Sequence, residues 1–155
     1  MDMYLIIKTL HIISATVLFG TGAGIAFFML CAYFTTNIHE KYFAARHTVL
    51  ADYIFTAPAV IIQPLSGLWL IWQGGYDWYS TWLMLTYILY IVAGLCWLPV
   101  VWIQIRLKNI TRIALEHNSD LPTEYYKLFK IWFILGWPAF VGLMIIFFLM
   151  VAKPT

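Results

Sequence analysis

The chain has 155 residues, of which 63% are hydrophobic and only 10% are charged, and its formal net charge is +2. Soluble domains carry about 25% charged residues, so this composition excludes an ordinary soluble domain and indicates an integral membrane protein. The net charge is small and basic residues do not interleave with aromatic ones, which excludes nucleic acid as the expected partner and leaves membrane lipid.

Four apolar stretches are long enough to cross a bilayer, which needs about twenty residues each as helix. They cover residues 4–34, 48–73, 79–105 and 128–152. They lack the alternation of barrel strands, so helices are the only spanning structure that satisfies their backbone groups. The sequence therefore predicts an all-α fold, a membrane four-helix bundle of four transmembrane helices that forms one domain over residues 1–155.

The basic residues predict how the helices are oriented. Seven of the nine Lys and Arg residues lie in the connection 35–47 and in the region 106–130, whereas the connection 74–80 has none. The positive-inside rule then predicts that the first and third connections are cytoplasmic and that both termini face outward. We expect a multi-pass membrane protein. Residues 106–117 alternate isoleucine with basic residues and predict an interfacial amphipathic helix.

The first stretch carries ionisable residues at membrane depth. Tyr4, Lys8 and His11 fall within about 60° of one another on a helix, and Ala15 and Gly22 continue the same stripe. Ionisable groups inside a membrane are costly, so Lys8 and His11 indicate function.

Gly20 and Gly24 of the same stretch have the GxxxG spacing. This spacing is typical of close helix packing, and it predicts contact either inside the bundle or in a homodimer through the Gly20/Gly24 face.

The second stretch contains Pro58 and Pro64. Each proline lacks an N–H, so the carbonyls of Ile54 and Val60 lose their helical partners. We expect Gln63 to compensate for one of them.

Asp52 is a carboxylate about one turn into the second stretch. It either relays protons or forms an ion pair, with Lys127, Lys130 or Arg46 as partner, and the ion pair is the favoured prediction.

The histidines suggest a cofactor. An imidazole inside a membrane bundle suits axial ligation of haem b, with a second group holding its other nitrogen. The alternative is a buried histidine that hydrogen-bonds to a Tyr or Ser across the bundle. Matching the depths of antiparallel helices places His11 level with Ser66, Gly67, Tyr87 and Tyr90. It places His47 about 20 Å away along the membrane normal, too far to share one iron. Lys8 is the expected propionate partner for a haem at His11, and Arg46, Arg106 or Lys108 for one at His47.

Several motifs resemble a known group of membrane proteins. KTLH at 8–11 and FTAPAVIIQPLSGLWL at 55–70 resemble the first two helices of HemJ-type membrane protoporphyrinogen oxidases. With LPVVWIQIRL and KLFKIWFILGWPAF, nearly the whole chain is similar to a bacterial four-helix membrane family of unknown function, grouped with HemJ and the copper-resistance CopD proteins. The resemblance implies a location in the bacterial inner (plasma) membrane, and it implies haem b, with His11 as its ligand and Lys8 beside it.

Together these observations predict a haem b-binding, cytochrome-like membrane protein with an electron-transfer or HemJ-like oxidoreductase role. Its iron ligand is His11, with His47 in reserve, and a quinone or a respiratory complex accepts the electrons. Two alternatives stay open: a non-enzymatic accessory or dimerising bundle, and a CopD-like copper or solute permeation protein. The candidate cofactor-binding residues are His11, Lys8, His47, Tyr87, Tyr90 and Arg106.

Overall fold

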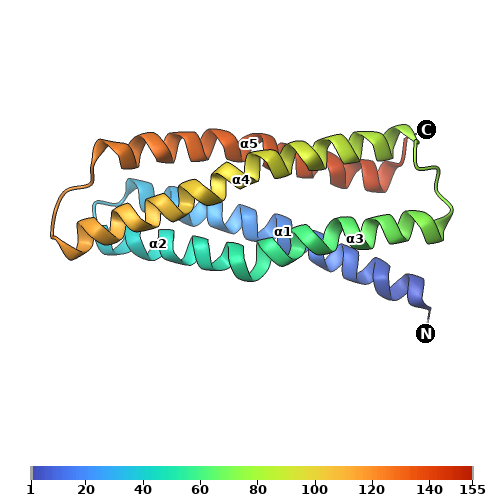
Figure 1. The fold of residues 1–155 in the computed structure, drawn as a ribbon, viewed down its shortest axis with the longest axis horizontal. Helices are drawn as coiled ribbons and strands as arrows, with labels where there is room; N and C mark the ends of the chain where they lie inside the picture. The colour runs from blue at the N-terminus through green and yellow to red at the C-terminus, as the bar shows by residue number, and fades with distance from the viewer. Residues whose placement is uncertain (1, 155) are drawn as a thin grey trace.

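The computed structural model describes residues 2–154, which form four long antiparallel helical rods (Figure 1). The first rod is α1 (Met3–Phe34), the third is α4 (Thr81–Glu116) and the fourth is α5 (Thr123–Ala152). The second rod is continuous and consists of α2 (Ile38–Ala51), the π-helix η1 (Asp52–Thr56) and α3 (Ala57–Gly74). Each rod is long and apolar enough to cross a membrane, which confirms the predicted all-α four-helix bundle.

The rods begin and end where the local sequence provides caps. The side chain of Asp2 accepts a hydrogen bond from the backbone N–H of Tyr4 at 3.0 Å, and that of Asn37 accepts one from His39 at 2.9 Å. Gly75 ends α3 in the left-handed conformation with φ 64°, which a residue with a Cβ adopts only with strain. These caps satisfy helix-end groups that lipid cannot satisfy.

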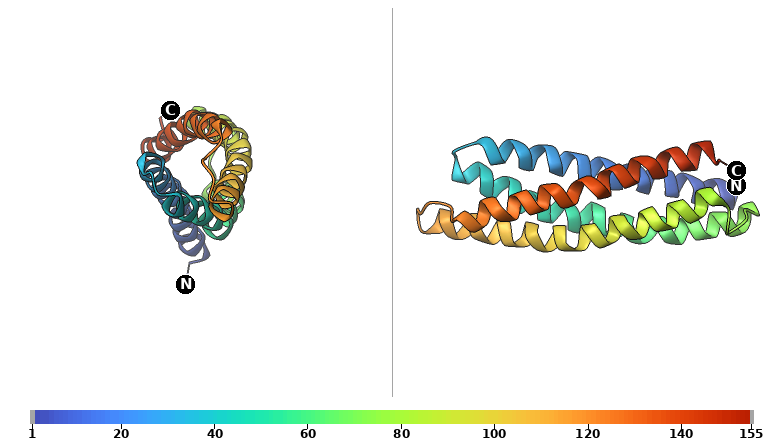
Figure 2. Two further views of the ribbon diagram at one scale, coloured as in Figure 1. Left: turned by 90° about the vertical axis from the view of Figure 1, so that its left-hand side faces the viewer. Right: turned by 90° about the horizontal axis from the view of Figure 1, so that it is seen from above.

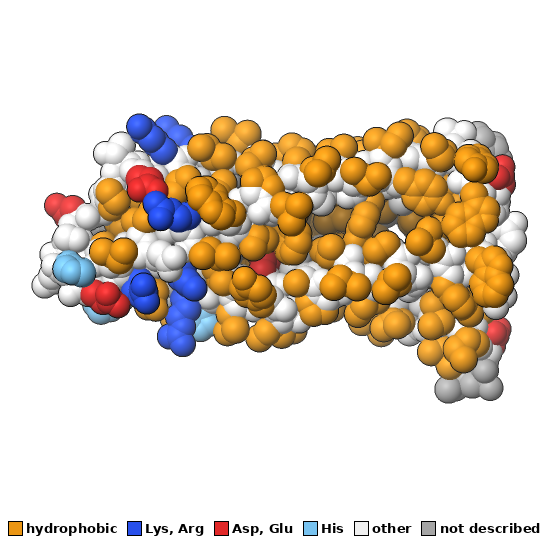
Figure 3. All heavy atoms as spheres, in the orientation of Figure 1, with side chains coloured by type: hydrophobic (Ala, Val, Ile, Leu, Met, Phe, Trp, Pro, Cys, Tyr) orange, Lys and Arg blue, Asp and Glu red, His pale blue; other side chains and the backbone are white. Residues whose placement is uncertain are grey.

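The two ends of the bundle differ in charge. Both termini and the connection 75–80 lie at one end, and the connections 35–37 and 117–122 lie at the other (Figures 1 and 2). Charged side chains gather at the second end, while hydrophobic ones cover the length between (Figure 3). Large apolar side chains in this band, such as Phe28, Leu65 and Leu95, are each 65% exposed, as expected of a surface in contact with lipid.

The helices extend further toward the charged end than predicted. The second rod begins at Ile38 rather than at 48, and α5 begins at Thr123 rather than at 128. The predicted interfacial helix after residue 105 is wrong, because α4 continues unbroken to Glu116. Leu107 and Ile110 are buried in the core cluster with Tyr125 and Phe129, so the apolar side of this segment packs on protein rather than lying flat on lipid.

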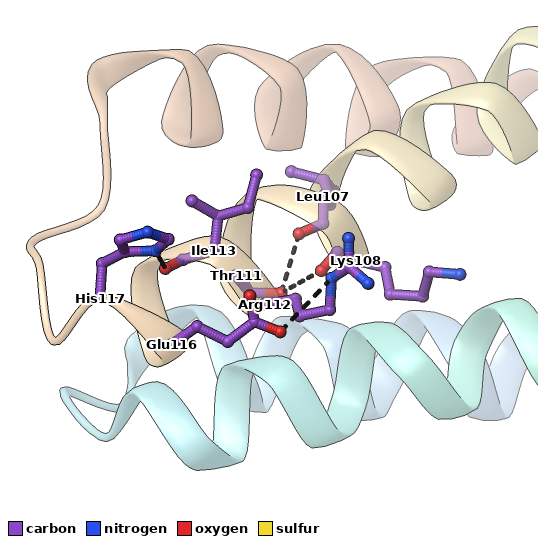
Figure 4. A network of polar contacts seen from close by, with 7 residues as sticks. All are labelled: Leu107, Lys108, Thr111, Arg112, Ile113, Glu116 and His117. Atoms are coloured by element: carbon purple, nitrogen blue, oxygen red, sulfur yellow. Dashed lines mark hydrogen bonds and ion pairs between the residues drawn. The ribbon is translucent and has the colours of Figure 1, made fainter.

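The last turns of α4 hold their polar groups locally (Figure 4). The hydroxyl of Thr111 donates to the carbonyls of Leu107 and Lys108 at 2.9 and 3.0 Å. An ion pair of 3.9 Å joins Arg112 to Glu116 one turn further on. These contacts keep the segment helical up to its end, where it leaves the apolar band.

The rods do not contact one another evenly. α4 packs along α5, α2 packs mainly on α4, and α3 packs on α1. α1 and α5 meet at few points, among them the stacked rings of Phe19 and Phe140, whose centroids lie 4.9 Å apart. The second rod therefore changes its main partner from α4 to α1 where η1 interrupts it.

Lys41 is buried although the sequence placed it in a polar connection. Only 5% of it is exposed, and its Nζ donates to the carbonyls of Ala32 and Tyr33 at 2.9 and 2.7 Å. The ammonium also lies 5.7 Å from the ring centre of Tyr33 and 5.5 Å from that of Tyr125. A cation here caps the negative end of the α1 dipole and ties α1 to α2 and α5.

A second lysine ties the opposite end together. Nζ of Lys153 donates to the hydroxyl of Tyr76 at 2.7 Å and lies 5.8 Å from the ring centre of Trp82. Its hydrogen bond and charge hold the pKa of Tyr76 below its ordinary value. This contact joins the end of α5 to the connection between α3 and α4.

Candidate functional site

His11 lies on α1 against α3, and its protonation pattern follows from its neighbours. Nδ1 of His11 is 2.8 Å from Oγ of Ser66, and that hydroxyl donates to the carbonyl of Ile62 at 2.6 Å. Because a serine hydroxyl has one proton, the tautomer of His11 that is compatible with the bond to Ile62 is the one in which Nδ1–H donates to Oγ of Ser66. Nε2 is then unprotonated and keeps its lone pair.

The surroundings of His11 hold the ring in place. Nε2 of Gln63 donates to the backbone carbonyl of His11 at 2.7 Å and also to the hydroxyl of Ser14. A Cβ at Gly67 would lie 3.2 Å from Cε1 of His11, so any side chain at this position would push the ring back by a few tenths of an ångström. The predicted depth of His11, level with Ser66 and Gly67, is confirmed.

The hydrogen bond to a serine, which we considered as the alternative to iron ligation, is therefore formed. It uses Nδ1 and leaves Nε2 available. His11 is partly exposed, and among residues 2–154 no hydrogen bond reaches Nε2. The ring can accordingly accept a further partner on that side.

The other predicted cofactor residues do not gather around His11. Lys8 is exposed on α1, with its Nζ 6.0 Å from the ring centre of Tyr4. Arg106, on α4 near the charged end, pairs with Glu124 at 2.6 Å. His47 is exposed on α2, with Nδ1 2.8 Å from the carbonyl oxygen of Phe43. It lines a groove between α1 and α2 that His11 does not border.

The two predicted tyrosines, Tyr87 and Tyr90, differ in whether their hydroxyl groups form a hydrogen bond. Tyr90 donates to the carbonyl of Val60 at 2.6 Å, the group that Pro64 leaves without a helical partner. Tyr90 thus takes the role predicted for Gln63, which serves His11 instead. The hydroxyl of Tyr87 is buried and has no hydrogen-bond partner within residues 2–154.

The predicted close packing of Gly20 inside the bundle is not found. A Cβ at Gly20 or Gly24 would meet no atom within 4 Å outside its own helix neighbourhood. Gly24 borders the groove between α1 and α2, and Gly20 is exposed.

A cavity of about 370 Å³ lies inside the bundle, bordered by α1, η1, α3, α4 and α5. Gly22, Gly94 and Gly136, each on a different helix, leave the space open, and Phe19 and Trp137 are among its aromatic walls. The space forms where α1 and α5 make few contacts. A hollow between hydrophobic side chains is visible near the middle of the molecule in Figure 3.

One part of this cavity is polar. Each of five lining residues has a buried polar atom without a partner in the described chain: Oδ2 of Asp52, Oγ1 of Thr56, Oε1 of Gln104, and the indole Nε1 of Trp97 and Trp132. The side chains of Thr56 and Gln104 lie beside the carboxyl group of Asp52. Asp52 and Trp132 are each 5% exposed, Thr56 is 4% exposed and Gln104 is 3% exposed.

Asp52 does not form the ion pair that we predicted. The ion pairs among residues 2–154 are Arg106–Glu124 and Arg112–Glu116, and neither Lys127, Lys130 nor Arg46 lines the cavity. The backbone explains the direction of the side chain. Asp52 opens η1, in which its carbonyl accepts from Ala57 five residues later, and π-helical turns are frequent at functional sites.

From the sequence we predicted only Asp52 among these five residues. Gln104 stands in the apolar run VVWIQI. A polar side chain at that depth indicates a functional site, as the carboxylate of Asp52 does. The two tryptophans carry no such signal, because indoles at membrane depth are usually read as apolar.

Metal ligands do not cluster in the part of the chain that the structure describes. No group of three or more His, Cys, Asp and Glu residues there could hold a metal ion. His47 lines the groove between α1 and α2, which His11 does not border, so the two imidazoles lie in separate surroundings.

The fold and the site define a multi-pass integral membrane protein whose bundle encloses buried polar groups. Residues 5–154 match the family described as "Predicted integral membrane protein (DUF2269)", and the chain belongs to this family. No curated protein and no solved structure matches the chain.

Proposed function

We propose that the protein binds haem b through Nε2 of His11 and serves in electron transfer or in a HemJ-like oxidation. The single observation that carries this proposal is the hydrogen bond from His11 to Ser66. Because Ser66 occupies Nδ1, the free lone pair lies on Nε2. Metal-ligating histidines nearly always have their second ring nitrogen held in this way.

The residues around His11 fit an axial imidazole. Gln63 and Ser14 fix the backbone that carries the ring, and Gly67 lets Cε1 of the ring approach α3 closely. Lys8 lies one turn before His11 and has no ion-pair partner among residues 2–154, so its ammonium is available to a propionate. Bound haem would supply one-electron chemistry at its iron, while these side chains orient the ligand nitrogen and balance charge.

The proposal includes a relationship to HemJ and CopD, supported by KTLH at 8–11 and by the proline-containing motif at 55–70. It places the charged end of the bundle in the cytoplasm of a bacterium, supported by the seven basic residues near that end. The electron acceptor is a quinone or a respiratory complex.

The visible absorption spectrum of the purified protein, oxidised and dithionite-reduced, tests the proposal. We expect a Soret band that is lost in His11→Ala and retained in the control His47→Ala. Wild-type protein expressed with sufficient haem and lacking this band would refute haem binding. A band lost in His47→Ala and retained in His11→Ala would assign the iron to His47 instead.

A further inference from the structure

The polar part of the central cavity is chemically incomplete. Five buried polar atoms converge on one space without partners in the described chain. Leaving a buried polar group unpaired costs about 1–3 kcal/mol, so in the hydrocarbon region a bound molecule, either a ligand or trapped water, must complete the set. A fold keeps such a set where something else completes it.

We propose that this cavity binds a lipophilic amine, with its protonated amino group at Asp52 and its apolar body along the aromatic walls. The charge of the site selects this class of ligand. Asp52 is a carboxyl group 5% exposed, and no cation of the chain pairs with it among residues 2–154. A ligand that brings its own cation neutralises this group when it is ionised.

The three acceptors of the site agree with an ammonium group, which donates and does not accept, and the indole N–H donors of Trp97 and Trp132 are left for an acceptor atom elsewhere on the ligand or for water. Oδ2 of Asp52 and Oε1 of Gln104 are unpaired acceptors, and the hydroxyl of Thr56 can accept as well. Three acceptors match the three N–H donors of a primary ammonium. The indoles of Trp97 and Trp132 border the same space, and aromatic rings are favourable neighbours for a cation.

The rest of the cavity suits an apolar ring. Its volume of about 370 Å³ lies in the range of small-molecule sites. Gly94 and Gly136 widen it, and Phe19 and Phe140 stack at 4.9 Å on its border. The surrounding surface is hydrophobic, so such a ligand arrives from the lipid phase (Figure 3).

This site is separate from the one proposed for haem. His11 does not line the cavity, and none of the five polar residues contacts His11 through a hydrogen bond among the described residues. The two proposals therefore stand or fall independently, and His11→Ala should leave amine binding unchanged.

The test compares two probes of similar shape, naphthylmethylamine and the neutral naphthylmethanol. Binding to the full chain in nanodiscs of zwitterionic lipid is measured by titration calorimetry, with protein-free nanodiscs to subtract partitioning. We expect saturable binding of the amine that weakens about tenfold or more in Asp52→Asn, the loss of one charge-assisted contact. The control Asp77→Asn removes a carboxylate from the connection 75–80 and should change nothing.

Equal affinity of the amine for wild type and Asp52→Asn would overturn the proposal. So would tighter binding of the alcohol than of the amine, which would indicate a neutral hydrogen-bonding ligand such as a quinone head group. Absence of saturable binding by both probes would show that the polar groups are satisfied by water alone, and this also overturns it.

A second pair of variants covers the case in which Asp52→Asn fails to fold. Gly94 borders the cavity and Gly20 does not, yet a Cβ at either position meets no atom within 4 Å. Gly94→Leu should fill the cavity and abolish amine binding, while Gly20→Leu should retain it. Retained binding in folded Gly94→Leu would place the amine elsewhere and refute the site.

Discussion

Gly67→Ala tests the contact that positions His11. The new methyl group would lie 3.2 Å from Cε1 of His11, closer than the roughly 3.5–4.0 Å at which carbon atoms pack favourably. The ring must therefore retreat by a few tenths of an ångström. That movement stretches the hydrogen bond to Ser66, now 2.8 Å, toward the limit of about 3.2 Å for a good contact.

The expected change in the free energy of unfolding is the sum of two opposing contributions. Replacing a helical glycine by alanine stabilises a protein by roughly 0.5–1 kcal/mol when the site has room. Weakening a hydrogen bond between neutral groups costs about 0.5–1.5 kcal/mol. We expect the net change in stability for Gly67→Ala to run from a gain of about 0.5 kcal/mol to a loss of about 1 kcal/mol, and the variant to be about 0.5–1.5 kcal/mol less stable than the matched control Gly20→Ala, whose new Cβ meets open space.

The assay is reversible unfolding of both variants in mixed detergent micelles, followed by near-ultraviolet circular dichroism. The same samples give a second readout, because a displaced Nε2 should weaken the Soret band of reconstituted Gly67→Ala and leave that of Gly20→Ala intact. If both variants gain stability equally, the ring is free to move and Gly67 does not position His11.

Two further predictions concern side chains that donate hydrogen bonds to backbone carbonyls, one at the charged end and one in the apolar band. Lys41→Met should lower the free energy of unfolding by about 2–4 kcal/mol, because it removes the two hydrogen bonds that the buried ammonium donates. The control Lys127→Met should have little effect on the same quantity. Equal unfolding midpoints of the two variants would show that water replaces the ammonium of Lys41. Tyr90→Phe should cost about 1–3 kcal/mol because it leaves the carbonyl of Val60 unpaired, and Tyr79→Phe, at an exposed position, is the control for the same equilibrium measurement.

The sequence predicted the features of this fold that depend on length and depth. Apolar runs predicted the four rods, and counting residues from the membrane faces placed His11 level with Ser66 and Gly67, as the structure shows. Such counting works because a helix rises by a constant 1.5 Å per residue, so depth is a linear function of position.

Features that depend on rotation about a helix axis were not predicted. The π-helical turn at 52–56 gives no clear pattern in sequence, and it decides that Asp52 points into a cavity rather than toward a lysine. The burial of Lys41 escaped prediction for a related reason. Its environment depends on where α1 ends and on two tyrosines, Tyr33 and Tyr125, that are distant from each other in the chain.

Because the second rod changes its packing partner at η1, the number of residues in that turn is constrained. Each residue of an α-helix advances the direction of the side chains by about 100°, so the wider turn at 52–56 leaves α2 and α3 out of phase. That phase difference lets one rod present one face to α4 and another to α1. Deleting a single residue from the turn would bring the two faces into line and pull either Asp52 or Ser66 away from its place. The number of residues between Asp52 and Ser66 is therefore fixed, and we expect a single insertion or deletion there to disrupt one of the two sites.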